Sequence, residues 1–524
     1  MSDNKIVENL EKLIEIGIAL SEDNSYPELL ELILYGAKSL THSDGGTLYS
    51  IENDTIKMDI VHSTSLAIHL GGLSDDPITF PNIPLYLEDG SPNYKNVVSY
   101  AYHHNKSVNI TDAYNDKQFD FSGVRKFDAI NDYHSKAFLA IPLRNHENDI
   151  IGILQLINPQ EKGSNKVIAY DHIAMRLTEA LASQASMVLT KHQLIRVLEE
   201  MFESVIELTA SAIDNKSPYT GGHCRRVPEL TLSIADAASA TEKGYLKDFK
   251  LSSTERYALK IAGWLHDCGK ITTPEYVVDK ATKLETIFDR IELIETRFEV
   301  LQRDVEIKYL KERLEALENN TAAPSHADFL AAQQSLTDDI NFIKQMNTGT
   351  EYMPPENQQR ILDIAKMTWL KLGIEYDVLS QNEVHNLNIA KGTLTEKERL
   401  VINSHITATI SMLEKINFPK HLKNVPEYAA GHHERMDGTG YPNGLTREQM
   451  SVPARIMAIA DIFEALTAKD RPYKKGKSLS EALTILGYMK KDNHIDPDIY
   501  DVFIENKLYL QYADEFLDDW QIDI

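Results

Sequence analysis

The sequence has few cysteines and no long apolar run. Only Cys224 and Cys268 occur among 524 residues, and they do not form a CxxC pair. A disulfide framework is therefore excluded, and a reducing, cytoplasmic location is predicted. No segment approaches the roughly 20 apolar residues of a membrane span, and residues 1–22 mix acids and lysines with apolar residues, unlike a signal peptide. The sequence thus predicts a soluble protein with no membrane partner.

Positive charge is also scarce. The 54 Lys and Arg residues face 79 Asp and Glu residues, which gives a formal net charge of −25. This excess of negative charge excludes broad binding to nucleic-acid polymers. A small phosphate ligand remains compatible with it, provided that metal ions and a few local cations dominate the site.

The length requires more than one hydrophobic core. At 524 residues the chain is expected to contain between two and four folding units. Hydrophobic residues make up 42% and charged residues 25% of the sequence, as in ordinary globular proteins.

Residues 1–165 have an α+β pattern. Apolar residues at helical spacing predict helices over 6–18 and 29–40, and alternating patterns predict strands over 45–52, 55–63, 136–145 and 149–158. The segments SDGGTLYSIEND, AIPLRN and DIIGILQLINP resemble GAF domains. This resemblance implies an antiparallel sheet with flanking helices that acts as a sensor for a small ligand, whose identity the sequence leaves open.

Residues 166–210 form a predicted signalling helix. Its apolar residues recur at alternating steps of three and four: Ile173, Leu177, Ala180, Met187, Leu194, Leu198, Met201, Val205 and Leu208. Two polar residues, Gln184 and Lys191, interrupt this stripe. A heptad seam of this kind predicts a parallel homodimer that couples sensor to effector. The alternative is an amphipathic helix that packs on its own domain.

Residues 211–510 read as a second, all-α domain with an insertion over 285–390. Within the insertion, one stripe of apolar residues predicts a helical hairpin that ends near the turn-forming segment EYMPPEN: Ile287, Ile291, Ile294, Phe298, Leu301 and Val305. The insertion carries no recognisable chemistry.

Imidazole and carboxylate side chains gather in five segments of this second domain. Seven of them could bind metal: His223, His266, Asp267, His405, His432, His433 and Asp461. Nitrogen and oxygen donors suit Fe, Mn or Zn, and a carboxylate can bridge two ions. Seven ligands are too many for one tetrahedral site with an open position, so two ions are expected.

Each of these residues also has a structural alternative. A lone histidine is more often a core or surface residue than a ligand, and the pair His432-His433 could cap a helix end. Asp461 could pair with Arg455 or Lys469 instead of a metal. The pair His266-Asp267 follows an apolar stretch, where a buried carboxylate is costly unless it is paired or metal-bound.

The order of the five segments resembles one family. HDCGK (266–270) and HHERMDGTGYP (432–442) are similar to the signatures of HD-GYP domains, and YTGGHCRRV, ARIMAIAD and RPYK resemble the other landmarks of that family. The resemblance implies a helical bundle with two divalent ions, Fe or Mn. It further implies hydrolysis of cyclic di-GMP to pGpG, and in some members further to GMP.

The resemblance also assigns roles to residues. It places one ion on His223, His266, Asp267 and Asp461, and the other on His405, His432 and His433 with Asp267 as the bridge. Lys270, four positions after His266 and therefore near it on a helix, would stabilise the attacked phosphate; a surface lysine is the alternative. Arg471 and Lys474 would bind the other phosphate, and the glycine-containing loop with Gly440 and Tyr441 would shape the site.

Three departures from the family pattern are visible. His266 and His405 lie 139 positions apart (405 − 266), which implies an insertion of about 100 residues between ligands, where it could cover the site or add a dimer contact. Thr409 stands where the family often has glycine. The segment SPYTGGH lacks the acid that holds a third ion in some members, which favours two ions.

Two other functions remain open. The ligand set does not read the bases, so another cyclic dinucleotide such as cyclic GMP-AMP is an alternative substrate. A weakly catalytic module that binds a cyclic dinucleotide and signals through partners is the other alternative. The complete ligand set and the presence of Lys270 favour an enzyme.

Overall fold

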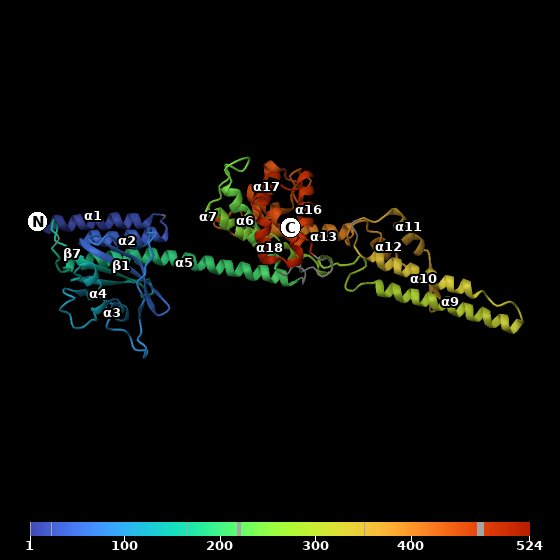
Figure 1. Ribbon diagram of the computed structural model, residues 1–524, viewed down its shortest axis with the longest axis horizontal. Coiled ribbons are helices and arrows are strands. Elements are labelled where there is room, and N and C mark those ends of the chain that lie inside the picture. The colour runs from blue at the N-terminus through green and yellow to red at the C-terminus, as the bar shows by residue number, and fades with distance from the viewer. Residues whose placement is uncertain (1, 23, 165, 217–221, 350–351, 469–475) are drawn as a thin grey trace. The chain divides into compact units, whose positions relative to one another are not determined.

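The computed structural model describes residues 2–22, 24–164, 166–216, 222–349, 352–468 and 476–524 (Figure 1). The chain divides into two units, Met1–Met201 and Phe202–Ile524. The predicted division at residues 165, 210 and 510 differs from these bounds and remains a prediction.

The first unit is built on a seven-stranded antiparallel sheet in the order β3-β2-β1-β7-β6-β5, with β4 paired to β2. Its strands are β1 (Ser43–Glu52), β2 (Thr55–Ser63), β3 (Ile68–Gly71), β4 (Ile83–Pro84), β5 (Val108–Ile110), β6 (Phe138–Arg144) and β7 (Ile150–Pro159). The register places Leu48 opposite both Ile60 and Leu154. The four predicted strands correspond to β1, β2, β6 and β7, whereas the short β3, β4 and β5 were missed because they carry too few residues to show a period.

Helices cover both faces of this sheet: α1 (Ser2–Ser21), α2 (Tyr26–Thr41), α3 (Val97–His104), α4 (Ser122–Asn131) and the N-terminal part of α5 (His172–Lys216). Leu139 and Ile141 of β6 pack against α1, α2 and α5, while Phe138 and Ala140 pack on the opposite side with residues of α3. This alternation follows from the two-residue period of a strand. The predicted α+β sensor fold with flanking helices is confirmed.

The long helix α5 confirms the predicted helix between the two domains and continues it to Lys216, while its signalling role remains a prediction. Most of the side chains of its predicted seam lie on the surface, including Met187, Leu198 and Leu208 at 65%, 58% and 71% exposure. Within the first unit, Leu181, Ala185 and Leu189 form a different face, which packs on the sensor core.

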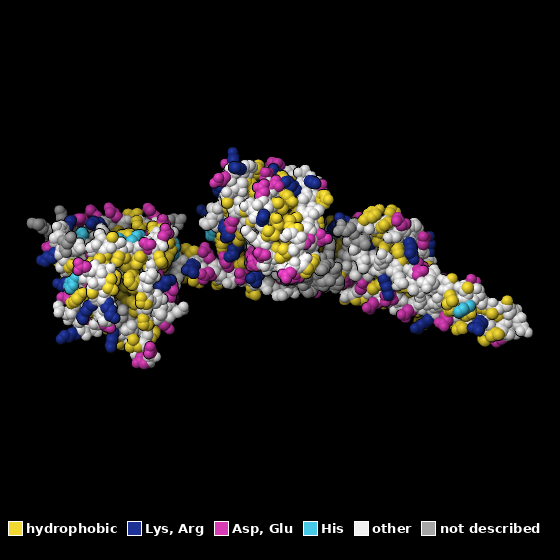
Figure 2. Space-filling view, viewed as in Figure 1, with side chains coloured by type: hydrophobic (Ala, Val, Ile, Leu, Met, Phe, Trp, Pro, Cys, Tyr) yellow, Lys and Arg dark blue, Asp and Glu magenta, His cyan; other side chains and the backbone are white. Residues whose placement is uncertain are grey.

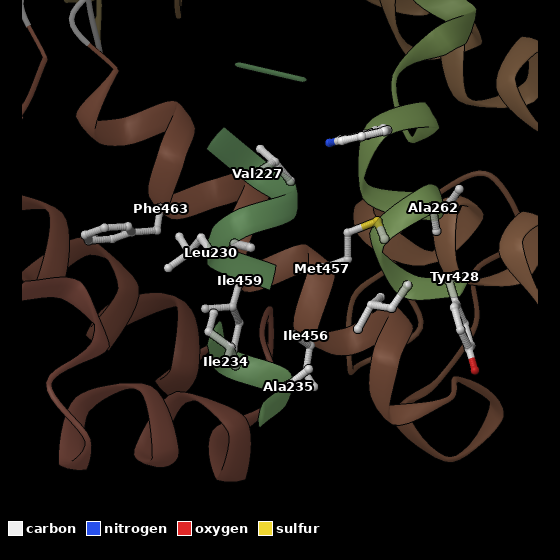
Figure 3. Close-up of a cluster of buried hydrophobic side chains, with 14 of the residues drawn as sticks. Val227, Leu230, Ile234, Ala235, Ala262, Tyr428, Ile456, Met457, Ile459 and Phe463 are labelled. Carbon is white, nitrogen blue, oxygen red and sulfur yellow. The ribbon is translucent and has the colours of Figure 1, made fainter. Parts of the chain in front are cut away.

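The second unit is a helical bundle with one central helix. The bundle comprises α6 (His223–Ala240), α7 (Ser253–Leu265), η1 (Cys268–Thr272), α8 (Glu275–Val278), α13 (Glu396–Leu413), η2 (Lys420–Leu422), α14 (Val425–Ala430), η3 (Gly431–His433), η4 (Arg447–Gln449), α15 (Val452–Thr467), α16 (Leu479–Lys491), α17 (Pro497–Glu505), α18 (Leu508–Phe516) and η5 (Asp519–Gln521). Helix α15 lies at its centre, and Ile456, Ile459 and Phe463 are completely buried (Figure 3). A helix that is apolar on nearly all sides is expected to be a core helix.

The predicted insertion has a hydrophobic core of its own, which runs from Leu284 to Leu387. It contains the expected helical hairpin, α9 (Ile291–Asn319) and α10 (His326–Asn347), followed by α11 (Pro355–Ile364), β8 (Thr368–Lys371), β9 (Ile374–Asp377) and α12 (Gln381–Leu387). The antiparallel pair β8-β9 corrects the expectation of an entirely helical insertion. Its four-residue strands are mostly exposed, so they show no apolar alternation in the sequence.

Lys280, which precedes the insertion, joins it to α13. Its Nζ donates to Asn386 Oδ1 of the insertion at 2.9 Å and lies 2.8 Å from Glu398 Oε2 at the start of α13. Helix α13 carries His405, so the insertion is fixed to an element of the candidate site.

Among the helices of the described residues, none combines the length and the apolar composition that crossing a membrane requires.

Candidate metal centre

The structure brings all seven predicted ligands together. Their donor atoms form two groups in which all atoms lie within 4.8 Å of one another: His223, His266, Asp267 and Asp461 in one, and Asp267, His405, His432 and His433 in the other. These are the two sets that the sequence resemblance implied, and Asp267 belongs to both.

The segments that carry these residues come from different elements of the bundle. His223 is the first residue of α6 and follows Gly222, whose φ of 83° favours glycine. His266 and Asp267 lie between the end of α7 and the start of η1. His405 lies on α13, His432 and His433 on η3, and Asp461 on the central α15.

Gly269 allows two of these segments to approach closely. A Cβ atom on Gly269 would lie 2.0 Å from the carbonyl oxygen of His405 and 2.6 Å from the amide nitrogen of Thr409. The amide of Gly269 instead donates to Thr409 Oγ1 at 2.9 Å. Thr409, which departs from the family pattern, therefore joins η1 to α13.

The two oxygens of Asp267 face different groups. Oδ2 lies 3.2 Å from His223 Nε2 and 3.3 Å from His266 Nε2. Oδ1 lies 3.1 Å from His405 Nε2 and 3.9 Å from His432 Nε2. A carboxylate in this position has one oxygen available to each of two cations.

The centre contains buried donor atoms without hydrogen-bond partners. Among the described residues, neither Asp267 Oδ1 nor His432 Nε2 takes part in a hydrogen bond, although His405 Nε2 lies 3.1 Å from Oδ1. His223 Nε2 lies 3.2 Å from His266 Nε2, and two imidazole nitrogens that face each other can hydrogen-bond only if one carries a proton. Buried polar atoms normally have partners, so this donor set fits divalent cations.

The protonation of His432, His433 and Asp267 is suitable for metal binding. Burial lowers the pKa of His432 well below its ordinary value and lowers the pKa of His433 to about 4, so both rings are neutral. Burial opposes ionisation of Asp267, but the charges of Lys270 and His266 hold its pKa well below the usual range. Metal binding requires neutral imidazole and ionised carboxylate. Although burial opposes it, nearby carboxylates instead raise the pKa of His223 well above its ordinary value and that of His266 to about 9, so these two rings must lose a proton when an ion binds.

The histidine rings are held by their second nitrogen. His266 Nδ1 donates to Gly263 O at 2.7 Å, His432 Nδ1 to Ala429 O at 2.7 Å, and His405 Nδ1 to Ile402 O at 2.5 Å. Each acceptor is the carbonyl three residues earlier. These bonds leave Nε2 directed at the centre.

His223 has a different partner, since it is the first residue of its helix. Its Nδ1 lies 2.5 Å from Oε2 of Glu464, which is one turn after Asp461 on α15. The other oxygen of Glu464 accepts from Arg226 Nε at 2.8 Å and Nη2 at 2.7 Å. Glu464 is completely buried, so Arg226 balances its charge.

Lys270 lies at the centre, but not where the sequence placed it. Helix α7 ends at Leu265, so Lys270 is on η1 instead of the helix of His266, and its Nζ lies 2.5 Å from Asp267 Oδ2. The end of α5 supports this segment: Lys216 Nζ donates to the carbonyls of Lys270, Ile271 and Thr273 at 3.2, 2.5 and 2.7 Å.

A cavity of about 520 Å³ opens beside the centre and is lined by His432, His433 and Asp461. Gly440 and Tyr441 also line it, and the Tyr441 ring stacks on His433 with centroids 4.8 Å apart. The loop that follows is held by the buried Glu434, which accepts from the amides of Asn443 and Leu445 at 2.8 and 2.9 Å.

The structure does not bear on two predicted substrate contacts, and it changes one alternative that the sequence left open for Asp461. Arg471 and Lys474 lie outside the described residues, as does Lys469, the suggested alternative partner of Asp461. Arg455, the other alternative, forms a buried ion pair with Asp496 instead.

Three supporting residues were not singled out from the sequence: Arg226, Glu434 and Glu464. Arg226 lies within YTGGHCRRV and Glu434 within HHERMDGTGYP, so both were inside segments already recognised. A charged residue in the apolar stretch of α15 was the available signal for Glu464, as it was for Asp461.

Comparison with known families identifies two domains. Residues 26–189 match the GAF domain and residues 379–499 match the HD domain. The predicted order, a GAF domain followed by an HD-type domain, is confirmed. The HD match includes His405, His432, His433 and Asp461, whereas His223, His266 and Asp267 precede it, on the other side of the insertion.

Curated relatives share parts of the chain. A 3′3′-cGAMP-specific phosphodiesterase from Vibrio cholerae is 36% identical over 134 residues, which are 26% of this chain and 30% of the relative. Cyclic di-GMP phosphodiesterases from Pseudomonas aeruginosa and Thermotoga maritima are 38% and 34% identical, each over 22% of this chain and over 26% and 30% of their own lengths. The chain thus spans less than a third of the length of each of these relatives.

Among solved structures, the GAF domain of an Acinetobacter phosphoenolpyruvate-protein phosphotransferase covers 36% of this chain and 95% of its own, at 14% identity and a TM-score of 0.26.

Proposed function

We propose that the chain is a metal-dependent phosphodiesterase that hydrolyses cyclic di-GMP to pGpG under the control of its GAF domain. The observation that carries the proposal is the position of Asp267, with one carboxylate oxygen toward each of two groups of histidines. Relatives named as phosphodiesterases of cyclic dinucleotides support the substrate class. Whether the product is cut further to GMP is part of the same assay.

The proposed metal sites follow the two groups. His223, His266, Asp267 and Asp461 would hold one ion, and His405, His432, His433 and Asp267 the other. Nitrogen and oxygen donors without thiolate suit Fe or Mn. Burial raises the pKa of Cys268 to about 11 and raises that of Cys224 well above its usual value, so both stay neutral thiols beside the ligands.

Divalent ions, when bound, would supply the Lewis acidity that phosphodiester hydrolysis requires. The chain itself would orient the substrate and hold its charge. A phosphate in the cavity would lie beside His432, His433 and Tyr441. The ammonium of Lys270, which lies 2.5 Å from Asp267 Oδ2, would stabilise its charge. Arg471 and Lys474 would bind the second phosphate of the ring.

The end of α5 supports the proposed control by the sensor. Asp214 accepts from the amide of Gly222, the residue before His223, at 3.0 Å. Two residues later, Lys216 binds the carbonyls of the segment after Asp267. One end of the signalling helix therefore contacts the segments of two proposed ligands, so that a shift of this helix would move both.

A parallel homodimer through α5 is part of the proposal. Its support is the exposed seam, in which Leu194, Met201 and Val205 have exposures of 52–59%. Helix α1 adds a second exposed stripe, formed by Val7, Leu10, Ile14 and Ile18. Apolar stripes at heptad spacing on a helix surface favour pairing with another helix.

The test is a turnover assay on protein purified anaerobically, combined with elemental analysis. The full chain is incubated with cyclic di-GMP and, separately, with 3′3′-cGAMP, and the products are separated by chromatography. We expect two metal ions per chain and pGpG from cyclic di-GMP. If 3′3′-cGAMP is cleaved faster, the proposed substrate is 3′3′-cGAMP instead. If a dinucleotide binds but is recovered uncleaved, the chain is a binding module.

A further inference from the structure

The helical hairpin of the insertion has an apolar face that the described residues of the same chain leave exposed. Ile307, Leu310, Leu314 and Leu317 of α9 are 48%, 51%, 58% and 72% exposed. They recur at steps of three, four and three, which forms a continuous stripe along one side of a helix. Hydrophobic atoms are visible among the charged ones along this hairpin in Figure 2.

The stripe lies away from the packing face of the hairpin. Helix α9 meets α10 through a face that includes the buried Phe298 and Ala316 and the ring of Tyr309, which stacks on Phe329 of α10 at 4.6 Å. At 3.6 residues per turn, the centre of the stripe is roughly 140° around the helix from that face. The hairpin is therefore complete without the stripe.

Charges flank the stripe in a pattern that complements itself. With Ile307 and Leu314 at position a of a heptad and Leu310 and Leu317 at position d, the flanking g positions are Glu306 and Arg313, and the flanking e positions are Lys311 and Glu318. Among the described residues these four side chains form no ion pair within the chain, whereas the neighbouring Lys308 and Glu312 face each other at 4.0 Å. The e and g positions of a coiled coil determine its partner.

Two copies of α9 would match these charges. In a parallel pair, Glu306 faces Lys311 of the second copy and Arg313 faces Glu318. In an antiparallel pair, Glu306 faces Arg313 and Lys311 faces Glu318. No pair of like charges arises in either orientation, and one heptad earlier the pattern ends because Arg303 occupies position d.

From these observations we infer that the α9 stripe of the insertion binds the same stripe on a second copy of this chain. The insertion is thus an arm for self-association, and this role is independent of the metal centre and of the proposed function. A pairing of about two heptads is weak by itself, so it would act together with the α5 seam by raising the local concentration of one arm around the other.

Cross-linking of the full chain tests the inference. Leu314→Cys places a thiol on the stripe, and both native cysteines are buried. A short bis-maleimide is expected to join two copies at this position. The matched control is Glu315→Cys, which is exposed but lies off the stripe and should cross-link several-fold less.

Charge reversals make the test specific. Glu306→Lys creates repulsion in both orientations and should lower the cross-linked fraction of Leu314→Cys at least about threefold. Adding Lys311→Glu should restore cross-linking if the pair is parallel, and adding Arg313→Glu should restore it if the pair is antiparallel. Equal cross-linking at positions 314 and 315, or no response to Glu306→Lys, would overturn the inference.

Discussion

The Nδ1 atom of His223 lies 2.5 Å from Oε2 of Glu464, although 241 positions separate the two residues. Glu464 in turn holds the guanidinium of Arg226. The three other histidines with a second-nitrogen partner donate to a backbone carbonyl, which no side-chain substitution can remove. His223 is therefore the proposed ligand whose orientation can be changed without altering the ligand itself.

Glu464→Gln should weaken the His223 ion and spare the other. Loss of an outer partner of a ligand histidine typically lowers metal affinity about 10–100-fold, so titration should show one tight and one weakened ion. The matched control is Glu383→Gln in the insertion, where another buried glutamate pairs with Arg297 at 2.8 Å. If Glu464→Gln still bound two ions tightly and only lost stability, as the control does, Glu464 would have a structural role and would not position His223.

Asp267→Ala should remove both ions, because each group depends on one of its oxygens. His405→Ala should remove only one, since His405 belongs to a single group. Elemental analysis of both variants after the same dialysis gives the comparison. If Asp267→Ala kept two ions per chain and near-normal turnover, the bridging assignment would be wrong.

Gly269→Ala should separate η1 from α13. Its new methyl group would collide with backbone atoms of His405 and Thr409, which cannot move without shifting α13. We expect a loss of stability of about 1–3 kcal/mol together with reduced metal content. Gly123→Ala on α4 is the control, since nothing lies within 4 Å of its Cβ position, and unchanged melting of Gly269→Ala would contradict the close approach.

Arg471→Ala and Lys474→Ala should leave metal content intact, because neither side chain has a lone pair for a cation. Each lost phosphate contact should cost about tenfold to a hundredfold in kcat/KM on cyclic di-GMP. Lys270→Ala should depress kcat more than affinity, since its contact would strengthen in the transition state. Wild-type kinetics for Arg471→Ala and Lys474→Ala would remove these residues from substrate recognition.

Charges on the α5 seam should dissociate the dimer. Leu198→Glu with Val205→Glu alters two side chains that are 58% and 53% exposed, so the fold should persist. In a Glu306→Lys background, sedimentation at micromolar concentration should change from dimer to monomer. Gln193→Glu, off the seam, should remain dimeric, and a dimer that survives the seam charges would exclude pairing through α5.

Local sequence patterns were enough to predict much of the secondary structure and the candidate metal ligands. Strands β1, β2, β6 and β7 and helix α5 follow from apolar periodicity, because a half-buried strand or helix must place apolar residues on one side. The seven candidate ligands could be selected because buried carboxylates and imidazoles need a chemical reason. The short strands β8 and β9 could not be predicted from the sequence, because most of their side chains are exposed and show no apolar alternation.

Only the tertiary structure decided how the ligands meet. The sequence could not show that Glu464 holds His223, that Gly269 lets α13 approach η1, or that Lys216 binds the segment after Asp267, because each contact joins residues at least 50 positions apart. It also misplaced Lys270, since nothing local marks the change from α7 to a 3-10 helix at His266. The sequence gives the residue types. The distances between them depend on how the helices pack around α15, and no short segment determines that packing.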